Sequence, residues 1–270
     1  GTLSSSSLSP TATFTYTLVS GTASTENSNF IISGNQLLTS TPLNFEEKAS
    51  YSIRVRSTTQ YNLSLEQTFT ITLNDVNEAP TLDAIANQTI CYTTGRQEIV
   101  LSGITAGPDA GQSVSLTASN SNSSLLSDLS ISNNNELRYR VAEGQSGTAT
   151  ITVRVQDDGG TLNGGTDTYS RSFILTINAL PAAQISSDKD QQLSKGETAV
   201  LTATGGSSYS WSNAAGIISG QNSATLTIRP LETTTYTVLV TNASGCESVA
   251  SYTITVNDDF RVLHAENFFT

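Results

Sequence analysis

The chain has 270 residues and a net charge of −11, from 23 acidic and 12 basic side chains. This balance argues against nucleic-acid binding, which needs clustered lysine and arginine to displace counterions. It suits a surface that repels itself and offers carboxylates to hard cations. No run of about 18 apolar residues is present, so we expect no membrane-spanning segment. No signal peptide opens the sequence, so we expect any export signal to lie outside it.

Apolar and polar residues alternate along most of the chain, with β-branched and aromatic residues at every second position. The clearest examples, in chain order, are residues 14–18, 51–55, 151–155, 236–240 and 252–256. A period of two predicts half-buried β-strands. Turns rich in glycine, asparagine and aspartate separate the strands at the spacing of sandwiches or barrels. Because no segment shows helical periodicity, the sequence predicts an all-β fold.

Three similar strand sequences recur along the chain, namely Phe69–Asn74, Phe173–Asn178 and Tyr252–Asn257. Each is typical of the last strand of a domain, and the first two run into proline-bearing joints at 78–80 and 179–181. Proline fixes φ and extends the residue before it, so we expect short and rather stiff joints. We predict tandem β-sandwich domains stacked into an elongated rod. The predicted domains are 1–79, 80–179 and 180–258, followed by a tail at 259–270.

The first predicted domain resembles bacterial cadherin-like repeats over nearly its whole length. The stretches that carry the likeness are Gly1–Ser4, Phe14–Gly21, Phe30–Leu37, Leu43–Glu46, Tyr51–Arg56 and Asp75–Pro80. In that family the Glu of the Leu-Asn-Phe-Glu stretch and the acidic linker bind calcium at the joint with the next domain. The resemblance carries this role over to Glu46, Asp75, Asn77 and Glu78. The aspartates that serve the family's upstream joint are absent from residues 5–9 and 58–60.

The second predicted domain resembles immunoglobulin-like repeats of large bacterial surface proteins, and the third resembles compact immunoglobulin-like or PKD-like repeats of Bacteroidota proteins. The stretches concerned are Leu82–Gln88, Gly147–Val153 and Asp157–Asp167 in the second, and Tyr209–Trp211, Thr235–Val238 and Asn242–Cys246 in the third. The tail, at Ala265–Thr270, resembles the start of the C-terminal sorting domain of type IX secretion cargo. These likenesses imply an adhesin on the outer surface of a Gram-negative bacterium, and the type IX secretion machinery as a partner.

The strongest candidate site is the joint between the first two predicted domains. Calcium takes six to eight oxygen ligands from carboxylates, amides and backbone. The candidate ligands are Glu46, Asp75, Asn77, Glu78, Asp109, Asp157 and Asp158. Carboxylates clustered at a hinge repel one another unless a cation neutralises them, so binding would stiffen the joint. The alternative is that these are solvated turn residues, a role that Asp and Asn favour.

Two other acidic stretches have weaker claims to an ion. The segment from Asp157 to Asp167 is either a local loop site or an ordinary glycine-rich hairpin, and it lacks the ligand spacing of an EF-hand. The segment from Asp188 to Asp190 is a second, weaker ion candidate and fits a solvated turn better.

The aromatic and sulfur residues have structural interpretations. We expect Trp211 to be the central core residue of the third domain, and Tyr236 to pack or to make a corner hydrogen bond. Cys91 and Cys246 fall in different predicted domains, so we expect no disulfide between them. Cys246 is expected in the closing hairpin as a small, partly buried residue.

Catalysis finds little support in the sequence. The single histidine, His264, lies in the tail, no Cys-x-x-Cys occurs, and no glycine-rich phosphate loop opens a helix. We therefore predict a non-catalytic stalk or adhesion fragment. The alternative is a carbohydrate-binding or spacer module of a secreted enzyme, for which Tyr92, Tyr139 and Tyr169 would have to present exposed, coplanar rings. A third possibility is that the third domain and the tail mainly serve export.

Overall fold

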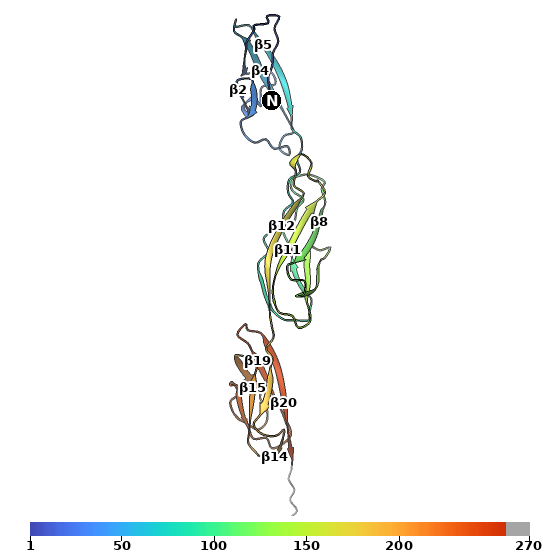
Figure 1. Cartoon of the computed structure of the whole chain (residues 1–270), viewed down its shortest axis with the longest axis vertical. Helices are drawn as coiled ribbons and strands as arrows, with labels where there is room; N and C mark the ends of the chain where they lie inside the picture. Colours follow the sequence, from blue (N-terminus) through green and yellow to red (C-terminus); the bar gives the residue numbers. More distant parts are fainter. Residues whose placement is uncertain (258–270) are drawn as a thin grey trace, which may run out of the picture. The chain divides into compact units, whose positions relative to one another are not determined.

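The structure, a computed structural model, describes residues 1–257 (Figure 1). The prediction of an all-β fold of tandem β-sandwiches is confirmed: within this range the only helical segments are two short 3-10 turns, η1 (Asn27–Asn29) and η2 (Leu162–Gly164). No helix in the described range is long and apolar enough to span a membrane. The predicted tail, with His264 and the sorting-domain likeness, lies outside the described residues.

By its internal contacts the chain divides into two compact units. Unit 1 consists of Gly1–Asp83, Gly103–Leu116 and Arg154–Ser170, and unit 2 of Ala84–Ser102, Thr117–Val153 and the chain from Arg171 onward. The candidate metal ligands all belong to unit 1, and both cysteines belong to unit 2. The candidate site and the cysteine pair therefore lie in different units.

The first sandwich lies in unit 1. Its strands are β1 (Phe14–Leu18), β2 (Phe30–Ser33), β3 (Gln36–Thr39), β4 (Ser50–Thr59) and β5 (Ser64–Thr72). They form one antiparallel sheet in the order β1-β4-β5 and a hairpin of β2 with β3. The alternation in β4 turns Tyr51, Ile53 and Val55 inward against Phe30 and Leu37, as the period of two predicts. The Phe30 and Tyr51 rings meet edge to face with centroids 5.9 Å apart.

The middle of the chain forms two further sheets. Their strands are β6 (Gln88–Cys91), β7 (Gln97–Val100), β8 (Val114–Asn120), β9 (Leu126–Ile131), β10 (Glu136–Val141), β11 (Gly147–Asp157) and β12 (Thr168–Asn178). The orders are β7-β10-β9 and β6-β12-β11-β8. Ile151, Val153 and Val155 of β11 are buried, as their alternation predicts. β6 pairs in parallel with the closing strand β12, and Cys91 lies opposite Asn178.

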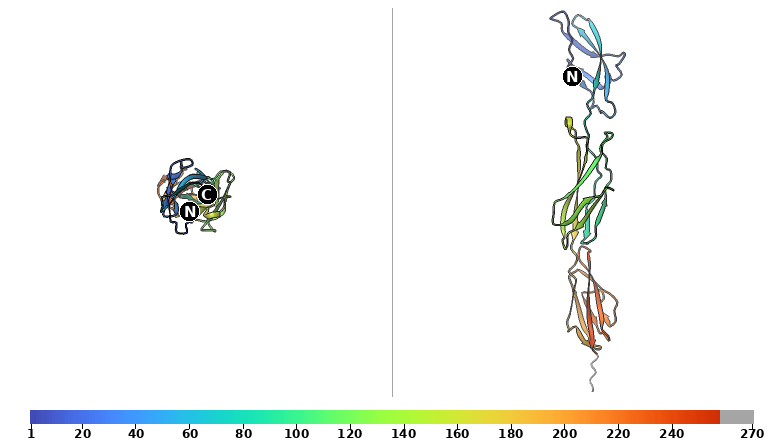
Figure 2. Two further views of the ribbon diagram at one scale, coloured as in Figure 1. Left: turned by 90° about the horizontal axis from the view of Figure 1, so that it is seen from above. Right: turned by 90° about the vertical axis from the view of Figure 1, so that its right-hand side faces the viewer.

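The third sandwich lies in unit 2 and is coloured orange to red in Figure 2. Its strands are β13 (Gln184–Ser187), β14 (Gln192–Ser194), β15 (Ala199–Thr204), β16 (Ser208–Trp211), β17 (Ile217–Ser219), β18 (Thr225–Ile228), β19 (Thr234–Thr241) and β20 (Glu247–Asn257). The sheets are β13-β15-β18-β17 and β14-β20-β19-β16, and β14 pairs in parallel with β20. Trp211, Tyr236, Val238 and Val240 pack in the core between them.

The expected roles of the two aromatic residues in this core are confirmed. Trp211 is 4% exposed, and its indole N–H donates to the Ser223 carbonyl at 3.0 Å. The Tyr236 hydroxyl donates to the Ala215 carbonyl at 2.8 Å. A buried polar group costs free energy unless it finds such a partner, so these two contacts let large aromatic residues fill a thin core.

The prediction for the cysteines is wrong. Cys91 and Cys246 form a disulfide, with Cα atoms 5.6 Å apart, which leaves no free cysteine among the described residues. Cys246 does lie in the hairpin between β19 and β20, where the Asn242 N–H donates to its carbonyl, but it is 1% exposed. The prediction failed because it assumed that cysteines pair only within a domain, whereas the pairing depends on the distance between two Cα atoms in the folded chain.

An acid-sensitive contact ties the first sandwich together. The Glu26 carboxylate accepts from the Lys48 ammonium at 2.7 Å and from the Ser52 N–H at 3.0 Å. The ammonium contact, followed by the backbone N–H, lowers the pKa of Glu26 to about 2. A depressed folded-state pKa stabilises the fold above the ordinary value of 4.5, and this stabilisation is lost as pH falls toward 2.

We expect Glu26→Gln to lower the melting temperature of the first sandwich at pH 7 and to change it little near pH 2. The amide cannot carry the charge that the ammonium stabilises, so the variant lacks the contribution that acid removes from the wild type. Thermal melts of both proteins from pH 7 to pH 2 measure this difference. A gap in melting temperature that stays constant down to pH 2 would contradict the assignment.

Candidate metal site

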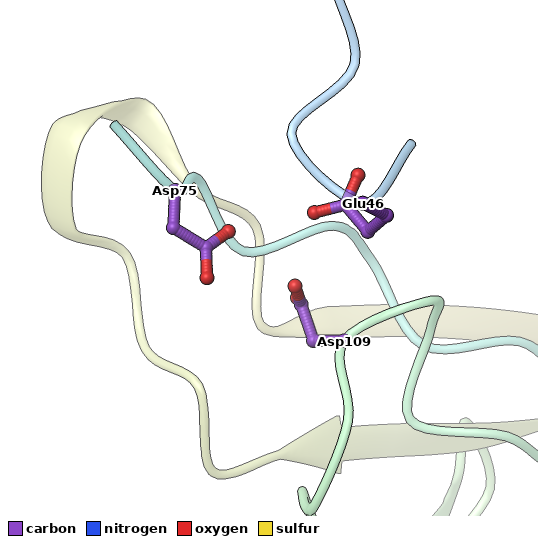
Figure 3. A group of neighbouring side chains, drawn as sticks. All are labelled: Glu46, Asp75 and Asp109. Carbon is purple, nitrogen blue, oxygen red and sulfur yellow. The ribbon is translucent and has the colours of Figure 1, made fainter. Parts of the chain in front are cut away.

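Three carboxylates converge beside the linker that follows β5. Glu46 comes from the loop between β3 and β4, Asp75 from the linker after β5, and Asp109 from the loop between β7 and β8. In Figure 3 their side chains point toward a common space, and their oxygens lie within 4.8 Å of one another. Calcium–oxygen distances are 2.3 to 2.6 Å, so ligands on opposite sides of one ion lie up to about 5 Å apart. The spacing therefore fits a single calcium ion.

A fourth carboxylate, on Glu78, lies close enough to interact electrostatically with the other three. Desolvation raises the pKa of Glu78, and the negative charges of Glu46, Asp109 and Asp75 raise it further. The backbone N–H of Glu78 donates to an Asp109 oxygen at 3.3 Å, which keeps the linker against that loop. None of the ion pairs found in residues 1–257 includes any of these four acids. Within the described part of the chain, no ion pair neutralises this concentration of negative charge.

Asn77 occupies the centre of a hydrogen-bond network beside these acids. Its amide nitrogen donates to Asp157 Oδ1, the Gly160 carbonyl and the Thr166 carbonyl at 2.9 to 3.0 Å. Its amide oxygen accepts from Gln112 Nε2 at 2.6 Å, and its backbone carbonyl accepts from the Thr166 N–H. The side chain of Asn77 is thus engaged in fixing the linker to the loop that follows β11.

Behind Asn77 lies a buried carboxylate with one free oxygen. Asp157 is 4% exposed, and its Oδ1 accepts from Asn77 and from the Gly159 N–H. Its Oδ2 is buried and has no hydrogen-bond partner within residues 1–257. The Oε1 atom of Gln112 is likewise buried and unpartnered, and Gln112 lines the same hollow as Asp75 and Asp109. Buried oxygens without donors are costly and are commonly satisfied by water or a cation. The donor chemistry of the hollow therefore fits a hard cation.

Asp158 has a different environment from the other predicted ligands. Its two oxygens accept from the backbone N–H and the hydroxyl of Ser113, at 2.9 and 2.6 Å. These contacts lower the pKa of Asp158. The structure thus brings together Glu46, Asp75 and Asp109, with Glu78 in electrostatic range. It places Asn77 and Asp157 in the supporting network and engages Asp158 with Ser113.

The sequence interpretation missed Gln112 and the reason for two glycines. A Cβ on Gly159 would overlap the Asn77 amide oxygen and Gln112 Nε2, and a Cβ on Gly165 would come within 3.1 Å of the Asn77 backbone and side chain. The glycine doublets at 159–160 and 164–165 are visible in the sequence and mark a close backbone approach as well as a turn. Nothing in the sequence marks Gln112.

The weaker sequence candidates find ordinary structural roles. Asp188 Oδ1 accepts from the Val200 N–H at 2.7 Å, and Lys189 pairs with Glu197, which fits the solvated turn. Tyr139 is 3% exposed and Tyr92 and Tyr169 are half-buried, so an exposed plane of rings on these three residues is not formed.

Comparisons with known proteins give a limited result. No protein-family model matches the sequence, and no curated protein sequence matches it significantly. Among solved structures, the chain is similar to mouse cadherin-23 EC22-24, with 15% identity, 91% of this chain and 86% of that chain covered and a TM-score of 0.44. It is also similar to mouse protocadherin-24 EC1-3, with 16% identity, 90% of each chain covered and a TM-score of 0.44. At these scores the likenesses carry no inference about ligands or partners.

Proposed function

We propose that the chain is a non-catalytic stalk segment of a secreted surface adhesin, whose first joint is stiffened by calcium. The observation that carries the proposal is the group of carboxylates on Glu46, Asp75 and Asp109 beside the linker. The proposed domains are 1–79, 80–179 and 180–258, supported by the sheets, none of which combines strands from two of these ranges. The disulfide supports an oxidising, extracellular location.

In the proposed site, Glu46, Asp75, Glu78 and Asp109 hold the ion. Calcium supplies positive charge that removes the mutual repulsion of these four acids and links the three chain segments that carry them. Asn77 and Asp157 act as supports, because their hydrogen bonds keep the linker against the loop after β11. Backbone carbonyls and water complete the six to eight oxygen ligands that calcium requires.

We expect millimolar calcium to raise the melting temperature of the chain relative to excess EDTA. Selective binding to the native state adds RT ln(1 + [L]/Kd), about 2.7 kcal/mol at one hundred times Kd. The measurement is differential scanning calorimetry in EDTA and in calcium, with a sodium chloride sample at matched ionic strength to remove general screening.

The decisive variant is Glu46→Gln combined with Asp75→Asn. Both side chains are exposed and make no side-chain hydrogen bond or ion pair with the rest of the described chain, so the apo protein should fold normally while the calcium response is lost. The matched control is Asp190→Asn, an exposed acid of the third sandwich, which should keep the full response. Identical melts of the wild type in EDTA and in calcium would remove calcium from the proposal.

We further propose export by type IX secretion to the exterior of the outer membrane of a Gram-negative cell. The support is the likeness of residues 265–270 to the start of a sorting domain. The adhesive target is an extracellular polymer or protein, in a setting such as gliding motility. If the third domain mainly serves export, its deletion should abolish secretion of the parent protein; unchanged secretion would assign it to the stalk.

A further inference from the structure

The disulfide connects β6, the first strand of the middle sheets, to β20, the last strand of the third sandwich. Cys91 is the last residue of β6, and Cys246 immediately precedes β20. The two cysteines are separated by 155 residues in sequence, yet their Cα atoms are 5.6 Å apart. The bond therefore closes a covalent loop around residues 92–245, which include β7 to β19.

Tension applied to the two ends of the chain has a short covalent route through this bond. It runs along β6 to Cys91, crosses to Cys246, and continues along β20 to Asn257. β20 has eleven residues, and a strand already rises about 3.3 Å per residue, close to the limit of about 3.6 Å for an extended chain. The β20 part of the route is therefore nearly fully extended in the native fold and can transmit force with little lengthening.

Without the bond, the same tension would pass through weaker contacts. Between Asn178 and the third sandwich, the polar contacts near the disulfide are Asn242 Nδ2 donating to the Ala179 carbonyl and the Cys246 sulfur 4.0 Å from the Asn178 carbonyl. Parallel pairing of β6 with β12 adds hydrogen bonds at Leu175–Asn178. A single exposed hydrogen bond contributes about 1 kcal/mol, so these contacts break long before a covalent bond does.

We propose that the Cys91–Cys246 disulfide is a mechanical bypass that keeps residues 92–245 out of the path of tension along the chain. The proposal gives the stalk function a specific mechanical property: strands β7 to β12 of the two middle sheets and strands β13 to β19 of the third sandwich carry no tension while the chain is pulled. It rests on the proposed stalk function for its use, but the bypass itself depends only on this bond and on neither the cation site nor the adhesive target.

The test is to pull the full 270-residue chain by its two ends in optical tweezers, with handles attached through peptide tags that carry no thiol. The oxidised chain should never release residues 92–245, even at forces that unfold the first sandwich. In reductant the fully unfolded chain should be longer by roughly 540 Å, from 155 residues at about 3.5 Å each. The double variant Cys91→Ala with Cys246→Ala should show this longer extension without reductant.

Two controls separate the bypass from other effects. Reductant should not change the extension of the double variant, and thiol alkylation of the native chain should label no cysteine before reduction and two after it. Equal final extensions of oxidised and reduced wild type, or free thiols in the oxidised protein, would overturn the proposal. A melting temperature that does not change with calcium would contradict the calcium-stiffened joint but would leave the result of the pulling experiment unaffected.

Discussion

Replacing both cysteines by alanine is expected to lower the free energy of unfolding of the third sandwich by about 4 kcal/mol. The disulfide restricts the unfolded chain, and the effect grows with the length of the loop that it closes. When the two sheets formed by β6 to β12 remain folded, Cys91 stays in register with Asn178. The loop that the disulfide then closes in the unfolded third sandwich is the 68 residues that separate Asn178 from Cys246. If both parts unfold together, the loop is that of the full 155-residue separation and the expected loss rises to about 5 kcal/mol.

Urea unfolding followed by tryptophan fluorescence measures this loss. Trp211 is the only tryptophan of the chain and is buried in the third sandwich, so its emission reports on that core alone. With denaturant slopes of about 1 to 3 kcal/mol per molar urea, the midpoint should fall by roughly 1.3 to 4 M. Reduced wild type should match the double variant. The matched control is Val249→Ala, a 63% exposed residue of β20, which should shift the midpoint little. Equal midpoints with and without reductant would contradict the expectation.

The strands could be predicted because their signal is local. Tyr51, Ile53 and Val55 alternate with polar residues, and only a strand puts such a set on one face. The same alternation includes Tyr236, which lies in the core beside Trp211, a residue expected there from its place in immunoglobulin-like sandwiches. The disulfide could not be predicted in this way, because nothing near Cys91 in sequence encodes its distance from Cys246. Only the fold of everything between them brings the two sulfurs together.

The candidate site shows the same division between local and non-local information. The family likeness points to Glu46 and Asp75 and does not include Asp109, yet these three carboxylates converge. Asn77 was predicted as a ligand because its amide offers an oxygen. The structure uses the amide nitrogen as well, since the neighbouring groups on Asp157, Gly160 and Thr166 are all acceptors. The role of an amide depends on which groups surround it, and the sequence does not contain that information.

Asn77→Asp is expected to destabilise unit 1 by about 3 to 5 kcal/mol, although it changes neither the size nor the shape of the side chain. The wild-type amide donates to three acceptors, one of which is the carboxylate of the buried Asp157 at 3.0 Å. A carboxylate at position 77 removes every donor and puts a second negative charge against the first. Asp157 already has one unpartnered oxygen, so the network has no spare donor with which to compensate.

Calorimetry at several pH values distinguishes this cause from a general disturbance of the linker. Repulsion from Asp157 must raise the pKa of the new carboxyl, so the variant binds a proton more readily when folded. A raised folded-state pKa means that the deficit is largest at neutral pH and shrinks as pH falls through that pKa. The matched control is Asn242→Asp, where the side-chain oxygen accepts from the Ser244 and Cys246 N–H groups and only one donated bond, to Ala179, is lost. We expect that change to cost less than about 1 kcal/mol, because a carboxylate accepts the same two bonds at least as well. If the two substitutions cost the same, Asn77 would be an ordinary linker residue, and the first joint would be held by its backbone and by apolar packing.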